Sequence, residues 1–85
     1  MNWHVYIVEC RDGTLYTGVA KDLDARIEAH NSGKGAKYTR SRRPVALVYA
    51  EPAEGRGAAQ QREYVIRKLR LADKVALIRR HGQAG

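Results

Sequence analysis

The sequence contains a single cysteine, and this scarcity removes two classes of small domain. With Cys10 alone, the chain can form neither an internal disulfide nor a cysteine-rich zinc site. Long apolar runs are also missing, since no stretch approaches the length of a membrane span. The N-terminus lacks a signal-peptide pattern, because Glu9 interrupts the first apolar run. We therefore expect a cytoplasmic protein that does not enter a membrane.

Acidic residues are few as well. Nine Asp and Glu stand against sixteen Lys and Arg, which gives a net charge of +7. Most of the excess is arginine, the residue that makes forked contacts to phosphate and carboxylate groups. A basic domain of this size points first to nucleic acid, then to an anionic membrane surface or an acidic protein. Charge alone leaves plain solubility equally open.

The length of 85 residues leaves room for one domain with one modest core. The sequence shows neither internal repeats nor low-complexity tracts. We expect a single domain over residues 1–81 and a frayed C-terminal tail over residues 82–85.

Two strand-like runs near the N-terminus predict a hairpin. Residues 3–10 alternate between apolar and polar positions, and residues 14–19 form a second run after the turn residues Arg-Asp-Gly. A two-residue turn would set Tyr6 and Tyr16 on opposite faces. A three-residue loop with a left-handed Gly13 pairs Cys10 with Thr14 and sets both tyrosines on one face.

We favour the three-residue loop because it gathers most of the large apolar side chains on the other face. Register selection rewards that arrangement wherever one face is buried. In this register Tyr6 lies opposite Gly18 and Tyr16 lies opposite Val8. Because Gly18 has no side chain, the sheet surface beside Tyr6 should be open.

A helix is predicted from Asp22, a suitable cap, to about residue 31, with Gly33 as its stop. Its inward stripe follows the spacing i, i+3, i+4, i+7 and consists of Leu23, Arg26, Ile27 and His30. A long arginine can lie along an apolar surface with its charge in water. An arginine and a histidine together on such a stripe, beside two tyrosines, favour a functional site over that alternative.

The following segment, residues 33–43, is a basic loop or short helix with one interleaved aromatic residue. Cations and an aromatic ring in this pattern suit contact with phosphates and stacking on bases or sugars. A solvated basic loop is the alternative for such a run. The candidate nucleic-acid-binding residues are Lys34, Lys37, Tyr38, Arg40, Arg42 and Arg43.

The rest of the chain predicts a third strand and two helices. The strand begins at Pro44 and ends before Pro52. The helical region runs from about Ala58 to His81 with a break near residues 71–73. Its apolar stripes are Val65, Ile66 and Leu69, then Val75, Leu77 and Ile78. The fold class is therefore α+β, a three-stranded antiparallel sheet flanked by helices in the order β-β-α-(short α)-β-α-α.

These features together resemble the GIY-YIG nuclease superfamily, in particular its small single-domain bacterial branch. The two tyrosine motifs appear as Val5-Tyr6-Ile7 and Tyr16-Thr17-Gly18. Residues 26–49, RIEAHNSGKGAKYTRSRRPVALVY, resemble that branch closely. The resemblance covers roughly residues 3–80. The motif pattern matches Tyr6, Tyr16, Arg26, His30 and Glu63, although periodicity alone makes Glu63 a surface carboxylate.

The resemblance implies a metal-dependent endonuclease or nickase acting on DNA with weak intrinsic sequence specificity. Glu63 would hold Mg²⁺ or Mn²⁺, and Arg26 would bind the scissile phosphate. Tyr6 would be the general base and Tyr16 an orienting group, with the reverse assignment open. Arg26 and the metal would favour the phenolate of the base. His30 would hold a tyrosine or a phosphate, or move a proton.

Two other functions stay open at this point. The chain could be a nucleic-acid-binding module that keeps the fold without turnover, or a basic protein that binds an acidic protein. RNA remains open as a substrate, as does a protein partner that supplies targeting. The sequence does not indicate an oligomeric state.

Overall fold

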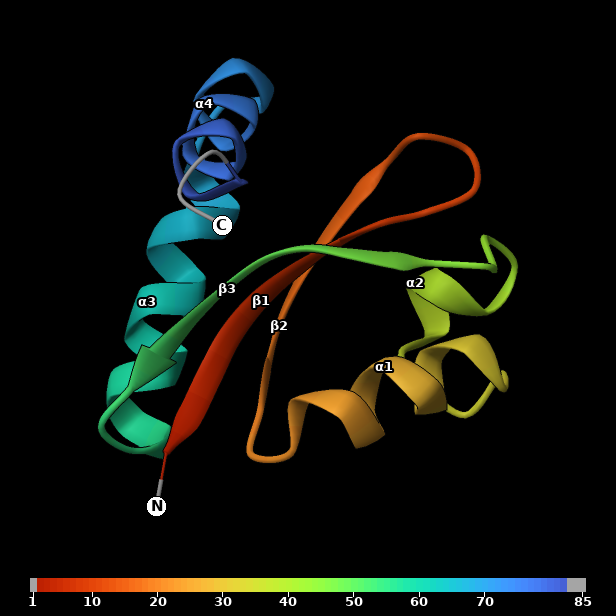
Figure 1. Ribbon diagram of the computed structural model, residues 1–85, viewed down its shortest axis with the longest axis horizontal. Coiled ribbons are helices and arrows are strands. Elements are labelled where there is room, and N and C mark those ends of the chain that lie inside the picture. Colours follow the sequence, from red (N-terminus) through yellow and green to blue (C-terminus); the bar gives the residue numbers. More distant parts are fainter. Residues whose placement is uncertain (1, 83–85) are drawn as a thin grey trace.

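The computed structural model describes residues 2–82 and shows the predicted α+β order (Figure 1). Three strands form one antiparallel sheet in the order β2-β1-β3, as expected. The elements are β1 (Trp3–Glu9), β2 (Leu15–Ala20), α1 (Leu23–Asn31), α2 (Lys37–Arg40), β3 (Ala46–Ala53), α3 (Arg56–Lys68) and α4 (Leu71–Gly82). Of the predicted tail, Gly82 ends α4, and residues 83–85 lie outside the described residues.

The hairpin of β1 and β2 has the predicted three-residue loop. Cys10 N donates to Thr14 O at 2.8 Å, and Gly13 has a φ of +85°, which glycine adopts without strain. Tyr6 pairs with Gly18 and Val8 pairs with Tyr16. The predicted register is therefore confirmed, and both tyrosines lie on one face of the sheet.

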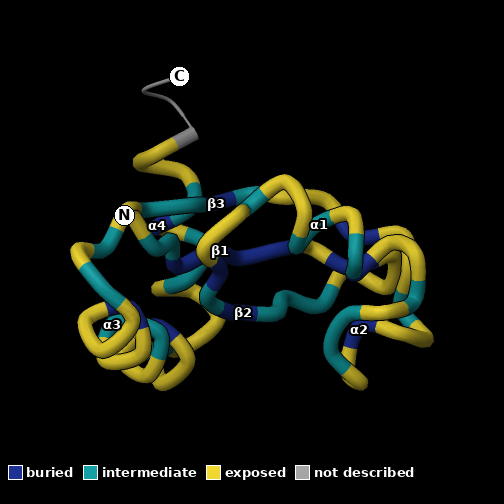
Figure 2. The backbone as a smooth tube through the Cα atoms, turned by 90° about the horizontal axis from the view of Figure 1, so that it is seen from below, coloured by how far each residue is buried: buried dark blue, intermediate teal, exposed yellow. Residues whose placement is uncertain are grey.

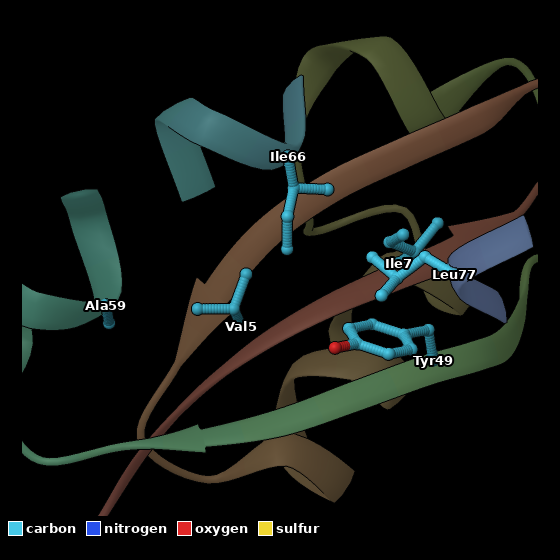
Figure 3. Packing of buried hydrophobic residues seen from close by; sticks show 6 residues of the cluster. All are labelled: Val5, Ile7, Tyr49, Ala59, Ile66 and Leu77. Atoms are coloured by element: carbon cyan, nitrogen blue, oxygen red, sulfur yellow. The ribbon is translucent and has the colours of Figure 1, made fainter. Parts of the chain in front are cut away.

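Helices cover both faces of the sheet, so the single core is split into two clusters. On one face, Val5 and Ile7 pack with Tyr49 of β3, with Ala59 and Ile66 of α3 and with Leu77 of α4; Figure 3 shows these six side chains. On the other face, the buried cluster is Tyr6, Val8, Cys10, Ala20 and Val45, with Leu23 and Ile27 of α1 packed against it. Strand β1 is consequently buried along most of its length (Figure 2).

Helix α1 begins and ends as the sequence predicts. The Asp22 side chain accepts a hydrogen bond from Ala25 N at 3.1 Å, which caps the first turn. Gly33, at a φ of +85°, follows the C-terminal end. The helix thus presents Arg26 and His30 to the sheet face that carries the tyrosines.

Three expectations for the C-terminal half were wrong in detail. Strand β3 continues through Pro52, because β3 is an edge strand of the sheet, where proline is tolerated. The break between α3 and α4 lies at Leu69, whose extended backbone (ψ 148°) ends α3 before residues 71–73. Val65 is 49% exposed, and the buried residues of α3 are Ala59 and Ile66, which lie two turns apart on one face.

Within residues 2–82, no helix has both the length and the apolar character needed to cross a membrane.

Candidate active site

A chain of hydrogen bonds joins four side chains on the tyrosine face. Tyr6 Oη lies 2.7 Å from His30 Nε2, and Arg26 Nε donates to the same hydroxyl at 3.3 Å. On the far side of the ring, His30 Nδ1 lies 2.8 Å from Thr39 Oγ1. The hydroxyl of Thr39 donates to the carbonyl of Ala36 at 2.9 Å. Strand β1 and helices α1 and α2 each supply part of this chain.

The centre of the chain is closed to solvent. Tyr6, His30 and Thr39 are each 0% exposed. Burial raises the pKa of the Tyr6 hydroxyl, and the hydrogen bond and charge of Arg26 offset this only in part. Arg26 thus favours the phenolate, as expected, but burial outweighs its effect and the pKa of the hydroxyl is raised overall. Burial and the charge of Arg26 both lower the pKa of His30, so its imidazole is neutral at pH 7.

Two glycines make room for the buried rings. A Cβ on Gly18 would lie 2.5 Å from Tyr6 Oη, and a Cβ on Gly35 would lie 2.8 Å from the Cα of His30. The Tyr6 ring therefore covers Gly18, and the predicted open surface at that point is filled by the tyrosine itself. Any larger residue at either position would displace Tyr6 or His30.

Tyr16 and Glu63 lie beside this chain. The hydrogen bond to Tyr6 is the main cause that raises the pKa of Arg26, and the charge of Tyr16 and a hydrogen bond to it add to this effect. The Tyr16 ring meets the edge of the His30 ring at a centroid distance of 5.4 Å. The charges of Tyr16 and Glu63 both act on Tyr6 and raise its pKa, behind burial as the main cause. Tyr16, Arg26 and His30 thus lie close to Tyr6, and Glu63 of α3 is near enough for its charge to act on the Tyr6 hydroxyl. The five residues of the motif pattern come from two strands and two helices.

A pocket of about 220 Å³ opens next to Tyr16. Its walls are Leu15, Tyr16, Thr17, Tyr38, Arg67 and Lys74. Tyr6 and His30 do not line this pocket, because both are fully buried. Tyr16, which is only partly buried, is therefore the motif tyrosine that lines a solvent-facing wall.

Glu63 is the carboxylate that could hold a metal here. Its side chain is 19% exposed and lies 3.7 Å from Arg67 Nη1, a long contact for an ion pair. Among the described residues, no group of three or more His, Cys, Asp or Glu side chains could enclose a metal ion. A single carboxylate completed by water and phosphate oxygens fits Mg²⁺, which keeps much of its hydration shell in proteins.

The basic segment is more ordered than its sequence indicates. Arg42 Nε lies 3.1 Å from Asp12 Oδ2, Arg42 Nη1 donates to Tyr38 O at 2.8 Å, and the guanidinium lies 4.0 Å from the centre of the Tyr38 ring. The Tyr38 ring also stacks against the Tyr16 ring, with 5.9 Å between the ring centroids. Arg42 and Tyr38 thus connect the segment to the hairpin. Arg42 and Tyr16 already contact the Tyr38 ring, so a base could stack only on the part of the ring that they leave uncovered.

The other cations of the segment remain exposed. Lys34 and Lys37 are exposed, and Arg40 and Arg43 are exposed along a pocket of about 500 Å³. Its walls are Arg11, Asn31, Arg40, Ser41, Arg43 and Pro44. Arg11, at the tip of the hairpin, is a cation of this surface that sequence reasoning missed, because it is distant in sequence from the basic segment.

Sequence reasoning also missed Thr39. It is the buried residue of α2, a helix of only four residues, and a helix that short gives no readable periodicity. Its neighbours in sequence, Tyr38 and Arg40, drew attention because their side chains carry charge or a ring.

Comparison with known proteins places this chain in a family. The family described as the GIY-YIG catalytic domain matches residues 2–75. The chain belongs to the GIY-YIG family. A UPF0213 protein of Staphylococcus aureus strain Mu50 is 56% identical over 75 residues, which cover 88% of this chain and 92% of the relative.

Two solved structures of similar proteins have the same fold. The UPF0213 protein BH0048 of Bacillus halodurans is 46% identical, with a TM-score of 0.58 over 92% of this chain and 83% of the relative. The protein EF2693 of E. faecalis is 34% identical, with a TM-score of 0.65 over 98% of this chain and 88% of the relative. The predicted family and fold are both confirmed.

Proposed function

We propose that this GIY-YIG domain is a divalent-metal-dependent endonuclease or nickase that hydrolyses phosphodiester bonds in DNA with weak intrinsic sequence specificity. The observation that carries the proposal concerns Arg26. Its guanidinium donates a hydrogen bond to the Tyr6 hydroxyl. Within residues 2–82, no carboxylate lies within ion-pair distance of this guanidinium. A partly buried cation without a counter-ion is suited to bind an anion such as a phosphate.

Arg26 binds the scissile phosphate in this proposal and stabilises the charge that develops on its oxygens. Tyr6 Oη is fully buried, so an attacking water reaches it only when Arg26 turns from the hydroxyl to the phosphate. The bond from Arg26 is the longest of those in the chain, at 3.3 Å. Its loss frees a lone pair on Tyr6 Oη to accept a hydrogen bond from the attacking water.

The proton balance then runs through Tyr6 and His30. The water oxygen attacks phosphorus as its proton passes to Tyr6 Oη, and the original Tyr6 proton passes to His30 Nε2, 2.7 Å away. The bond from phosphorus to the leaving oxygen breaks, and that oxygen is protonated from solvent. His30 afterwards returns its proton to solvent. Tyr6 therefore relays a proton as a neutral phenol, and the raised pKa of its hydroxyl is no obstacle.

Glu63 would hold the metal, Mg²⁺ or Mn²⁺, and Tyr16 would orient water or phosphate at the pocket wall. A bound divalent ion supplies Lewis-acid stabilisation of the leaving oxygen. Lys34, Lys37, Arg40 and Arg43, with Arg11, would hold the backbone of the nucleic acid without reading its sequence.

The test is nicking of supercoiled plasmid in Mg²⁺ or Mn²⁺, with wild type and Glu63→Ala purified in parallel. We expect wild type to nick DNA and Glu63→Ala to be inactive with unchanged or slightly tighter DNA binding, because a negative charge near phosphate is removed. Equal rates for the two proteins would mean a contaminating nuclease or a metal site elsewhere.

Parallel assays separate the alternatives. Single-stranded and structured RNA are offered under the same conditions to decide between DNA and RNA. If neither nucleic acid is cut with any divalent ion but both bind, the domain is a binding module. If neither DNA nor RNA binds, the remaining hypothesis is that the domain binds an acidic protein.

A further inference from the structure

Helix α2 brings one buried side chain to the site. Of its four residues, Thr39 alone is buried, and it is 0% exposed. Thr39 makes two hydrogen bonds, one to the carbonyl of Ala36 and one to the ring of His30. The hydroxyl of Thr39 thus links the backbone of the basic segment to the centre of the candidate site.

These two bonds fix the direction of every proton in the chain. A threonine hydroxyl has one hydrogen, and the carbonyl of Ala36 can only accept, so the Thr39 hydrogen points to Ala36. Thr39 Oγ1 must then accept from His30, which means that Nδ1 carries the ring proton. A neutral ring protonated at Nδ1 leaves Nε2 as an acceptor.

The other end of the chain fits this direction. With Nε2 as acceptor, Tyr6 donates its hydrogen to His30 and accepts from Arg26 Nε. In the opposite tautomer, the hydrogens of Arg26 and of His30 Nε2 would both point at Tyr6 Oη. The hydrogen of Tyr6 would then lose its partner inside a fully buried site, and Thr39 would have to give up Ala36 to serve His30.

We propose that Thr39 is a positioning residue that holds His30 in the tautomer protonated at Nδ1, so that Nε2 faces Tyr6 as a proton acceptor. Gly35 keeps the ring in place, because a Cβ there would collide with His30. The consequence for catalysis rests on the proposed nuclease function, in which His30 receives the proton of Tyr6. The tautomer itself does not depend on that function.

The direct test is ¹⁵N NMR of the histidine rings in the intact, wild-type protein at pH 7.5. Protonated and unprotonated ring nitrogens have well-separated shifts, and His30→Gln identifies the signals of His30 among the three histidines. We expect Nδ1 to be protonated and Nε2 to be unprotonated. A ring protonated at Nε2, or an even mixture of the two tautomers, overturns the proposal.

Two substitutions of Thr39 separate its hydroxyl from its bulk. Thr39→Val keeps the shape and removes the acceptor, and Thr39→Ser keeps the hydroxyl and removes a methyl group. We expect the valine variant to lose the fixed tautomer and the serine variant to keep it. Thr17→Val, the same change at a buried threonine of β2, is the matched control and should leave the His30 tautomer unchanged.

Wild type, Thr39→Val and Thr39→Ser are then compared in the nicking assay. Thr39→Val should lower turnover by about 10–100-fold, as for other residues that orient a catalytic group, with DNA affinity unchanged. Thr39→Ser should restore most of the rate. A valine variant that keeps both tautomer and rate overturns the proposal. If the tautomer responds as expected but wild type cuts no nucleic acid, the positioning role stands and the proposed function fails.

Discussion

The two faces of the sheet carry similar polar residues with different consequences. On the α3 and α4 face, Tyr49 donates to Glu51, and Arg62 Nε lies 2.7 Å from Glu51 Oε2. On the α1 and α2 face, Tyr6 bonds to a neutral histidine, and Arg26 has no carboxylate partner among the described residues. Each face thus holds a tyrosine, an arginine and an acceptor.

The acceptor makes the difference. Burial raises the pKa of Glu51, but hydrogen bonds from Arg62 and Tyr49 outweigh it and hold that pKa below its ordinary value. The carboxylate closes the network, because it neutralises the arginine and satisfies the tyrosine. His30 satisfies the tyrosine without neutralising Arg26. A neutral acceptor therefore leaves the charge of a neighbouring arginine available for an anion, whereas a carboxylate consumes it.

Removing the arginine from each face should show this difference most strongly. Arg26→Ala should lower the nicking rate by about 10²–10³-fold, the usual cost of losing one donor to the reacting group, and also weaken DNA binding. Arg62→Ala should leave the rate per folded molecule unchanged and lower the free energy of unfolding by about 1–2 kcal/mol, because Glu51 loses its partner. Nicking rates and urea unfolding measure the two effects. Equal losses of activity in Arg26→Ala and Arg62→Ala would contradict the proposed difference between the two faces.

The exposed cations should give a smaller effect, on binding alone. DNA affinity should fall by about an order of magnitude or more over a few-fold rise in salt. Arg40→Ala and Arg43→Ala should each reduce the salt slope by about 1, for all DNA sequences alike. Arg56→Ala, an exposed arginine of α3, is the control with the same charge change. A slope that responds equally to all three variants would place the DNA elsewhere.

Arg42 should behave differently from these cations. Its contacts with Asp12 and Tyr38 attach the basic segment to the hairpin. Arg42→Ala should therefore lower stability, by about 1 kcal/mol or less for such exposed contacts, as well as affinity. Thermal unfolding of Arg42→Ala beside Arg40→Ala measures this, and equal midpoints would contradict the structural role.

Acid should weaken the two faces in different pH ranges. The pKa of folded His30, which faces Tyr6, Tyr16 and the charge of Arg26, lies below its ordinary value of about 6.5. Below that value the unfolded chain takes up a proton that the folded chain resists, so stability falls. The pKa of folded Glu51 is below the ordinary glutamate value of about 4.3. Its contribution to stability is therefore complete above about pH 4.3 and is lost as the pH falls through the folded pKa.

Urea unfolding at a series of pH values from 7.5 to 3 separates these ranges. His30→Gln should remove the decline that begins near pH 6.5 and leave the later one. An unchanged slope between pH 6.5 and 5 in His30→Gln would show that His30 does not titrate on unfolding.

Local patterns were enough to predict the parts of the site that lie on regular elements. The alternation in β1 and the left-handed Gly13 fix the register, and the stripe of α1 brings Arg26 and His30 to the tyrosines. These features depend on residues within a few positions of one another, so a single sequence contains them.

The features that were missed depend on pairs far apart in the chain. The pair of Arg62 and Glu51 joins two elements, and the partners are eleven residues apart in the sequence. Arg42 looked free for DNA because its partner Asp12 lies thirty residues earlier. Thr39 acts through His30, nine residues away, from a helix too short to show a pattern. Such pairings depend on the folded packing, which composition and periodicity do not encode.

The most direct test of the difference between the faces is the nicking rate per folded molecule of Tyr6→Phe and Tyr49→Phe, measured on one plasmid in Mg²⁺. Each variant loses a single hydroxyl from one face. Tyr6→Phe should lose about 10²–10⁴-fold in rate, as expected for a group that transfers a proton, and keep its fold. Tyr49→Phe should nick at the wild-type rate and lose about 1 kcal/mol of stability. A Tyr6→Phe protein as active as wild type, or a Tyr49→Phe protein equally impaired, would contradict the account.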